Sequence, residues 1–288
     1  MELIKTLFWV SRPVSWINTA YPFTVAYLLS GGSNIFAAVV GTLYFLIPYN
    51  LMMYGINDVF DYESDLRNPR KGGIEGALLD RKWHKLVIRT SVIGSMPFLM
   101  FLTLVGTSAS TSWLYLFVFT VIAYSAKGLR FKEKPFLDSL TSASHFVGPM
   151  IYGLALAEAD LSEPKLLSMV LAFTLWGIAS HAFGAVQDVQ ADREGGISSI
   201  ATSIGARATV RFAFVAYALA GILVLFAGWP GALAAIAAIP YLAIVGPFWN
   251  ITDATCENAN AGWKKFIWLN FFAGFVVTLL VIWYAIIR

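Results

Sequence analysis

The stretch NDVFDYESD at residues 57–65 places three aspartates and an asparagine directly after a long apolar segment. If a helix continues through this stretch, Asp58, Asp61 and Asp65 fall at i, i+3 and i+7, on one face of the helix. Asn57 borders the same face. Carboxylate and amide oxygens are ligands that Mg²⁺ prefers, and this ion commonly shares its coordination shell with substrate phosphates. The stretch therefore indicates a metal site.

A second acidic stretch, AVQDVQADREGG, places Asp188 and Asp192 four residues apart, before a glycine pair that ends the helix. Asp58 and Asp65 lie about 10 Å apart along a helix axis, which is too far for one ion. Two such helix ends together suit two or three Mg²⁺ ions and a diphosphate. A single acidic run is often only a solvated helix end. Two spaced runs in a hydrophobic chain favour function.

A diphosphate also needs cationic side chains from the protein. The candidates are Arg67 and Arg70 in DLRNPRKGG, and Arg130 and Lys132 in YSAKGLRFKEKP. Arginine offers a two-pronged fork to phosphate oxygens, whereas lysine acts as a point charge. Membrane topology alone would also place basic residues in these loops, so both interpretations stay open.

The elements that position these residues are predicted to be membrane-spanning helices. Hydrophobic residues make up 58% of the 288 residues and charged residues only 13%, far from the balance of a soluble domain. A span needs about 20 apolar residues. Nine segments qualify, at residues 14–30, 35–56, 86–105, 111–125, 138–157, 166–187, 210–227, 231–249 and 266–287.

Basic residues predict the orientation of these spans. Of the 20 lysines and arginines, all but Lys165 and Arg288 fall at connecting segments on one side. The positive-inside rule then places the N-terminus in the cytoplasm and the C-terminus outside. The net charge of +3 reflects this topology and predicts no nucleic-acid partner. We expect one all-α domain, residues 1–288, with nine transmembrane helices around a central cavity and cytoplasmic cap loops at 66–85 and 193–209.

Three further polar side chains are candidates for supporting roles. His181 lies seven residues before Asp188 on the same helix face, where it is a candidate base or a support for a metal ligand. A buried structural histidine is the alternative. Asn18 is a polar group within the first predicted span. Gln187 precedes Asp188 directly.

The acidic stretches resemble the two motifs of the UbiA superfamily of intramembrane prenyltransferases. The first motif of that family, N-D-x-x-D-x-x-x-D, is matched in full at residues 57–65. The second occurs as D-x-x-D-x-x-x-D or as a shorter D-x-x-x-D, and Asp188 with Asp192 matches the shorter form. Ala185 stands where the longer form has its first aspartate, so Gln187 or water would complete the metal shell.

The loop after the fourth predicted span strengthens the resemblance. The family signature Y-x-x-x-x-x-[RK]-x-K is matched by Tyr124, Arg130 and Lys132. Membership implies that Mg²⁺ held by both motifs, with Asp61 and Asp188 central to catalysis, promotes ionisation of an allylic diphosphate. The allylic cation must then be shielded from water and stabilised by aromatic faces, and Tyr124 is the best candidate for that role.

The acceptor is suggested by whole segments. SRPVSWINTAYPF and SHAFGAVQDVQADREGGISSIAT are most similar to the carotenoid branch of the superfamily, the lycopene elongases. That branch implies dimethylallyl diphosphate as donor and lycopene as acceptor. The absence of lysine and arginine from the predicted span interiors suits such an uncharged acceptor. An aromatic or quinone-precursor acceptor remains an alternative. A membrane transporter is the rival class, although its functional groups would lie nearer the bilayer midplane.

Overall fold

The computed structural model describes residues 2–66 and 78–287, and among them it forms helices and turns but no strand. Contacts divide the chain into two units, each described here by itself. Unit 1 comprises Met1–Phe131 and His145–Ala159, and unit 2 comprises Lys132–Ser144 and Asp160–Arg288. The prediction of a single domain, residues 1–288, stays a prediction.

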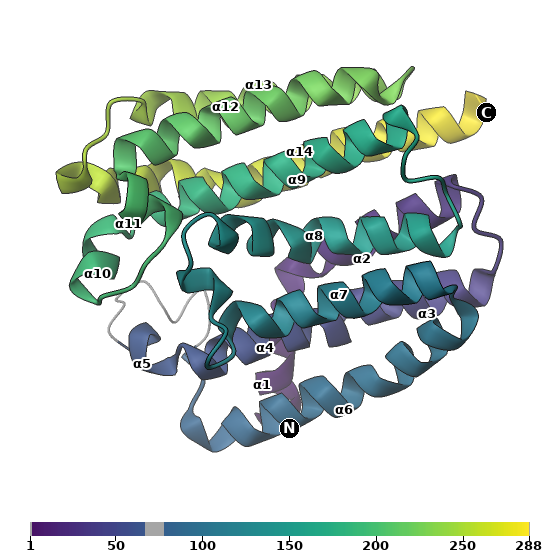
Figure 1. The fold of residues 1–288 in the computed structure, drawn as a ribbon, viewed down its shortest axis with the longest axis horizontal. Coiled ribbons are helices and arrows are strands. Elements are labelled where there is room, and N and C mark those ends of the chain that lie inside the picture. Colours follow the sequence, from purple (N-terminus) through teal and green to yellow (C-terminus); the bar gives the residue numbers. More distant parts are fainter. Residues whose placement is uncertain (1, 67–77, 288) are drawn as a thin grey trace. The chain divides into compact units, whose positions relative to one another are not determined.

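Figure 1 traces the helices along the chain. In unit 1 they are α1 (Glu2–Val10), α2 (Trp16–Leu29), α3 (Ile35–Leu46), α4 (Pro48–Phe60), α5 (Tyr62–Asp65), α6 (Arg81–Val105) and α7 (Ser108–Ser125). Helix α8 (Leu137–Leu156) begins in unit 2 and ends in unit 1. In unit 2 they are α9 (Pro164–Val186), α10 (Val189–Glu194), α11 (Ile200–Ile204), α12 (Ala206–Val224), α13 (Ala238–Val245) and α14 (Asn260–Ile287), with the 3₁₀ segments η4 (Gly231–Ala237) and η6 (Asp253–Ala259).

Helix forms at each of the nine predicted spans. Within the described residues, seven helical stretches are long and apolar enough to cross a bilayer: Ile35–Phe60, Arg81–Val105, Ser108–Ser125, Pro164–Val186, Ala206–Ala227, Gly231–Phe248 and Asp253–Ile287. The other two are α2, which has only 14 residues, and α8, whose first half is rich in polar residues. The prediction of an all-α polytopic fold is confirmed, whereas the number nine stays a prediction.

Helices extend into both predicted cap loops, 66–85 and 193–209. Helix α6 already begins at Arg81, because Asp80 caps it by accepting a hydrogen bond from the backbone N–H of Lys82 at 3.1 Å. This bond holds the pKa of Asp80 below its usual range. The second loop contains α11 and the first turn of α12. Residues 67–77 lie outside the described residues.

Unit 1 is built around a cluster of aromatic side chains. Phe23 stacks on Tyr152 with ring centroids 5.7 Å apart, and Phe45 packs against Phe23 and Tyr49. Aromatic rings bury large apolar areas and favour stacked and edge-on geometries of this kind. The predicted span 35–56 is interrupted at Pro48, which lacks the N–H needed to continue a helix and instead starts α4.

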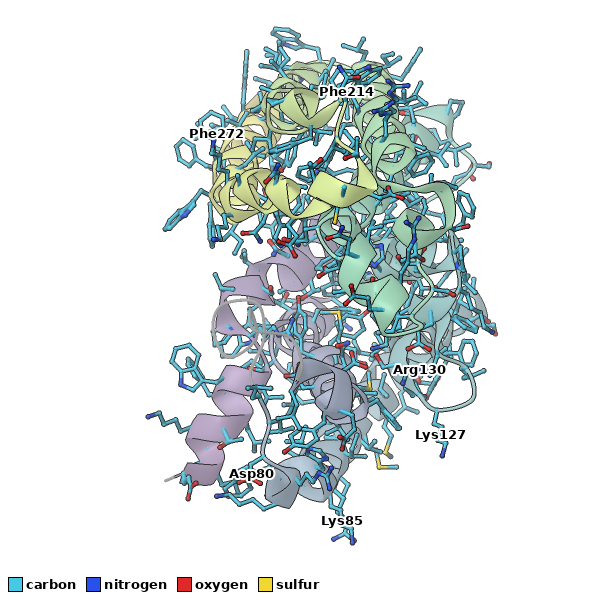
Figure 2. All side chains as sticks on the ribbon, turned by 90° about the vertical axis from the view of Figure 1, so that its left-hand side faces the viewer. Asp80, Lys85, Lys127, Arg130, Phe214 and Phe272 are labelled. Carbon is cyan, nitrogen blue, oxygen red and sulfur yellow. The ribbon has the colours of Figure 1, made fainter. Side chains whose placement is uncertain are left out.

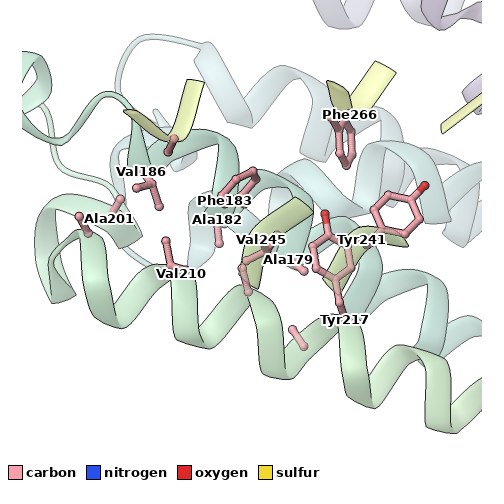
Figure 3. Close-up of a cluster of buried hydrophobic side chains, with 14 of the residues drawn as sticks. Ala179, Ala182, Phe183, Val186, Ala201, Val210, Tyr217, Tyr241, Val245 and Phe266 are labelled. Atoms are coloured by element: carbon pink, nitrogen blue, oxygen red, sulfur yellow. The ribbon is translucent and has the colours of Figure 1, made fainter. Parts of the chain in front are cut away.

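Unit 2 is built around the contact between α9 and α12, which small residues allow to approach closely. Ala179, Ala182 and Ala213 are fully buried in this contact, as Figure 3 shows for the two on α9. Tyr217 and Tyr241 stack nearby with ring centroids 5.0 Å apart. Apolar side chains also cover the outside of the unit, and Phe272, 57% exposed, is among them (Figure 2). Such an apolar exterior is what a bilayer requires.

The packing of α8 onto α2 in unit 1 predicts that one added methyl group at Gly153 strongly lowers the stability of the protein. A Cβ atom at Gly153 would lie 2.6 Å from the backbone carbonyl oxygen of Phe23. Because backbone cannot move as a side-chain end can, Gly153→Ala should destabilise the protein by about 2 kcal/mol. The matched control is Gly94→Ala on α6, where a Cβ meets nothing within 4 Å. Thermal unfolding in detergent should separate the two variants, and equal unfolding temperatures would contradict this packing.

Candidate functional site

The first acidic motif lies at a break between two helices. Helix α4 ends at Phe60, and Asp61 adopts φ −99° and ψ 0°, a sparsely populated backbone region in which active-site residues are often found. After Asp61 a new short helix, α5, begins at Tyr62 and ends at Asp65. The condition under which the three aspartates would share one helix face, a helix that continues through residues 57–65, is therefore not met.

Asp58 is buried and forms an ion pair with Arg12. The Nη2 atom of Arg12 donates to Oδ1 of Asp58 at 2.8 Å, and the aspartate side chain has no exposed surface. The guanidinium also lies over the ring of Tyr54, 4.2 Å from its centroid. A buried carboxylate needs such a cation, because removal from water otherwise disfavours its charged form. Arg12 thus places a positive charge beside the buried carboxyl group of Asp58.

Asp61 is held from two sides. Its Oδ2 accepts a hydrogen bond from Nδ2 of Asn57 at 2.9 Å, and its Oδ1 lies 3.9 Å from Nη2 of Arg130. Asn57 also donates to the hydroxyl of Ser125 at 3.4 Å, at the end of α7. Arg130, labelled in Figure 2, follows a turn in which Gly128 has φ +92°. The described contacts therefore bring Asn57, Asp61 and Arg130 together.

Tyr124 lies one residue before Ser125 and packs edge-on against His145, with ring centroids 5.1 Å apart. The backbone carbonyl of His145 accepts a hydrogen bond from the hydroxyl of Tyr49 at 3.3 Å. Because Ser125 contacts Asn57, the end of α7 that carries Tyr124 lies beside the first acidic motif. Tyr124 therefore lies on the helix end that contacts the first acidic motif through Ser125.

The second acidic motif repeats the backbone geometry of the first. Helix α9 ends at Val186, and Asp188 adopts φ −100° and ψ −2°, almost the values of Asp61. The short helix α10 then begins at Val189 and carries Asp192. In each unit, a long helix breaks at an aspartate and a short helix follows.

Contacts within unit 2 fix the segment around the second motif. The Oε1 atom of Gln187 accepts a hydrogen bond from Asn260, which joins the end of α9 to the start of α14. Arg193, the residue after Asp192, donates to Oδ2 of Asp253 at 2.6 Å. The other oxygen of Asp253 accepts from the backbone N–H of Ala206 at 2.7 Å. Helix α10 is thereby tied to the N-terminus of α12.

His181 contacts a buried carboxylate through a serine. Its Nδ1 lies 3.0 Å from the hydroxyl of Ser139, whose backbone N–H donates to Oδ1 of Asp138 at 2.7 Å. The Oδ2 atom of Asp138 accepts from the backbone N–H of Ile200 at 2.7 Å. Asp138 is completely buried. This network joins α8, α9 and α11, and it gives His181 a structural setting.

The remaining predicted site residues are Asn18, Lys132, Arg67, Arg70 and Asp65. Asn18 is half-buried in α2, and no hydrogen bond described for the chain joins it to an acidic motif. Lys132 lies in a short 3₁₀ segment after α7. Arg67 and Arg70 lie outside the described residues, and of Asp65 only the backbone is described.

Sequence reasoning missed three residues: Arg12 and Asp253, which hold segments of the two motifs, and Asp138, which anchors the network around His181. Arg12 and Asp253 carry no signal that spacing could reveal, because their partners lie 46 and 60 residues away along the chain. Asp138 did carry one. It is a carboxylate at the start of a predicted span, and ionisable groups within spans are rarely incidental.

The donor atoms of the first motif fit magnesium better than a soft metal. The side chains gathered there, Asn57, Asp58 and Asp61, offer oxygen ligands and no histidine nitrogen or thiolate. In the part of the chain that the structure describes, no three acidic, histidine or cysteine side chains lie close enough to hold a metal by themselves. Mg²⁺ usually completes its shell with water and substrate phosphate oxygens, so the residues present fit a metal that arrives with a diphosphate.

Similar proteins are found by sequence. Residues 19–276 match the UbiA prenyltransferase family. A C(50) beta-cyclic carotenoids biosynthesis protein of Dietzia sp. is 56% identical over 282 residues, which cover 98% of this chain and 65% of that protein. The chain thus spans less than two thirds of that relative. A lycopene elongase/hydratase of Corynebacterium glutamicum is 52% identical, with 98% of both chains covered.

Solved structures share the fold. A UbiA homologue from Archaeoglobus fulgidus, determined with DMAPP and Mg²⁺ bound, superposes with a TM-score of 0.67 at 17% identity, covering 96% of this chain and all of that one. The family match extends over most of the chain, and the long apolar helices agree with it. The chain therefore belongs to the UbiA prenyltransferase family, and it is an all-helical, multi-pass membrane prenyltransferase.

Proposed function

We propose that this enzyme transfers a dimethylallyl group from dimethylallyl diphosphate to the ends of lycopene, in carotenoid biosynthesis. The donor site rests chiefly on one observation, the pairing of buried Asp58 and Asp61 with Arg12 and Arg130. The acceptor is supported by the names of relatives that are 52% and 56% identical to this chain. The donor is supported by the DMAPP named for a structure of the same fold.

In this proposal, Mg²⁺ is the cofactor and the residues of the acidic motifs are its candidate ligands. When bound, the metal supplies positive charge that stabilises the departing diphosphate. Asn57, Asp58, Asp61 and Asp65 of the first motif and Asp188 and Asp192 of the second would hold it. Arg130, with Lys132, Arg67 and Arg70, would bind phosphate oxygens, because guanidinium forks match them. The positive-inside pattern puts these groups and the N-terminus in the cytoplasm.

The proposed reaction then has three steps. Cleavage of the carbon–oxygen bond releases diphosphate and leaves an allylic cation. A terminal double bond of lycopene attacks this cation, forming a carbon–carbon bond and a tertiary cation. Loss of a proton gives an alkene, whereas capture of water gives an alcohol, a branch that fits the printed name elongase/hydratase of the relatives. Tyr124 would face the first cation, since aromatic faces attract positive charge.

An aromatic or quinone-precursor acceptor is the second candidate. Such acceptors often carry a carboxylate, which would need a cation deep within the bilayer. Of the described cations that pair with the first motif, Arg12 is taken up by buried Asp58, and Arg130 is assigned here to the diphosphate. Lycopene needs no such partner, and its binding would rest on apolar burial and the shape of the cavity.

The metal proposal predicts a large effect of single carboxylates. Asp61→Ala and Asp188→Ala should each lower turnover by about 10³-fold or more, since stabilisation of the leaving group is lost. Both variants should retain their helical content in membranes. Prenyl transfer in isolated membranes, with and without EDTA followed by Mg²⁺, would measure this. Full activity in EDTA would contradict the metal mechanism.

The Arg12 ion pair predicts a combined loss of stability and activity. Arg12→Ala removes the cation beside buried Asp58 and should cost about 3 kcal/mol of unfolding free energy, since one charge of a buried pair is left behind. Arg12→Lys keeps the charge and should retain part of both. Lys5→Ala, an exposed position on α1, is the control. Unfolding in detergent and donor kinetics would be measured, and equal behaviour of Arg12→Ala and Lys5→Ala would refute the role of the pair.

The acceptor assignment predicts two successive products. Because both ends of lycopene are alike, a pigment with one added five-carbon unit should appear first and a pigment with two should follow. Mass analysis of pigments from a lycopene-producing bacterium that expresses the protein would detect both, and would distinguish alkene from alcohol ends. An Asp61→Ala strain is the control. Lycopene left unchanged while the purified enzyme prenylates hydroxybenzoate would overturn the acceptor and keep the prenyltransferase.

A further inference from the structure

Unit 2 has a surface pocket of about 570 Å³ outside the two acidic motifs. Its walls come from the start of α12, with Arg207 and Arg211, and from the segment before α14, with Ile251 and Asp253. The two arginines are exposed and lie four residues apart, so they share one face of α12.

Local contacts hold the arginines at the pocket. The Nε atom of Arg207 donates to the backbone carbonyl of Ile251 at 3.4 Å. Arg211 donates to the side chain of Asn250 at 3.4 Å, and its guanidinium lies over the ring of Trp249, 5.1 Å from the centroid. These contacts leave most of the N–H groups of each fork for a ligand, because a guanidinium carries five donors.

The acidic residue of the pocket does not cancel this positive charge. Asp253 accepts hydrogen bonds from Arg193 at 2.6 Å and from the N-terminus of α12, through the backbone N–H of Ala206, at 2.7 Å. The charge of Asp253 is thus matched by Arg193 and the N-terminus of α12, and not by Arg207 or Arg211. The pocket therefore has a net positive wall and suits an anion.

The same face of α12 continues as an exposed apolar stripe. Val215, Leu219 and Ile222 follow Arg211 at spacings of four, four and three residues, and they are 50%, 45% and 52% exposed. They lie within Ala206–Ala227, a stretch long and apolar enough to span the bilayer. A free phosphate ion would gain nothing from contact with these apolar side chains, whereas the acyl chain of a lipid would pack against them.

Aromatic residues lie beside the pocket. Trp249 is 39% exposed and packs edge-on against Phe214, with ring centroids 5.3 Å apart (Figure 2 labels Phe214). Tryptophan is enriched at the level of lipid headgroups. The arginines, the tryptophan and the apolar stripe thus follow the order of a lipid molecule, from phosphate to acyl chain.

We propose that this pocket is a binding site for an anionic phospholipid, with its phosphate at Arg207 and Arg211 and an acyl chain along Val215, Leu219 and Ile222. Basic pockets near the ends of transmembrane helices recognise anionic headgroups through charge. No residue of the acidic motifs lines this pocket, so the proposal does not depend on which prenyl acceptor the enzyme uses.

The test uses the full chain, purified in a neutral detergent and mixed with phosphatidylglycerol or phosphatidylcholine. Native mass spectrometry would count retained lipids. The wild type should retain phosphatidylglycerol at least about tenfold more strongly than phosphatidylcholine. Arg207→Ala/Arg211→Ala should lose this preference. Lys264→Ala/Lys265→Ala removes the same charge from the exposed start of α14 and should keep it.

Three results would overturn the proposal. One is equal retention of the two lipids by the wild type. Another is loss of the preference in the Lys264→Ala/Lys265→Ala control, which would make it a general charge effect. The third is thermal stabilisation by inorganic phosphate alone, abolished in the arginine variant, without any lipid preference, which would assign the pocket to a free anion.

A second measurement does not depend on the folding of a variant. A phosphatidylglycerol with a photoreactive group on its acyl chain would be cross-linked to the wild type, and the labelled peptides would be mapped. Labels should concentrate on Val215–Ile222. Labels spread evenly over the lipid-exposed helices would refute the site.

Discussion

The burial of carboxylates in an apolar helical protein constrains the rest of this structure. Asp58 and Asp138 have almost no exposed surface, and a buried charge is stable only where cations or N–H donors match it. Arg12 supplies the match for Asp58, and the backbone N–H groups of Ser139 and Ile200 supply it for Asp138. Each carboxylate therefore contacts a segment of its own unit that is distant along the chain.

Each acidic motif lies at a break between two helices. Asp61 and Asp188 share nearly the same φ and ψ, and each stands between a long helix and a short one. Because of this break, the residues of one motif do not belong to a single uninterrupted helix. The same break geometry thus occurs once in each unit.

The apolar exterior and the polar ends of the helices have different roles in a membrane prenyltransferase. Exposed apolar residues such as Phe272 suit contact with lipid tails, whereas the arginines and aspartates gather at helix ends. The Asp253–Arg193 pair joins the proposed lipid pocket to α10, which carries Asp192. Lipid recognition and donor binding would then share one structural segment of unit 2, although they use different side chains.

The sequence by itself determined the helical fold class, the membrane setting and both acidic motifs. Those depend on hydrophobic length, local spacing and residue type, all of which can be read along the chain. Pro48 even carried a local signal for the break between α3 and α4. Only the tertiary structure decided that Arg12 pairs with Asp58, that Asp138 binds the N-terminus of α11 and that Asp253 joins α10 to α12. These partners lie 46 to 62 residues apart, and packing of whole helices, which no local pattern encodes, brings them together.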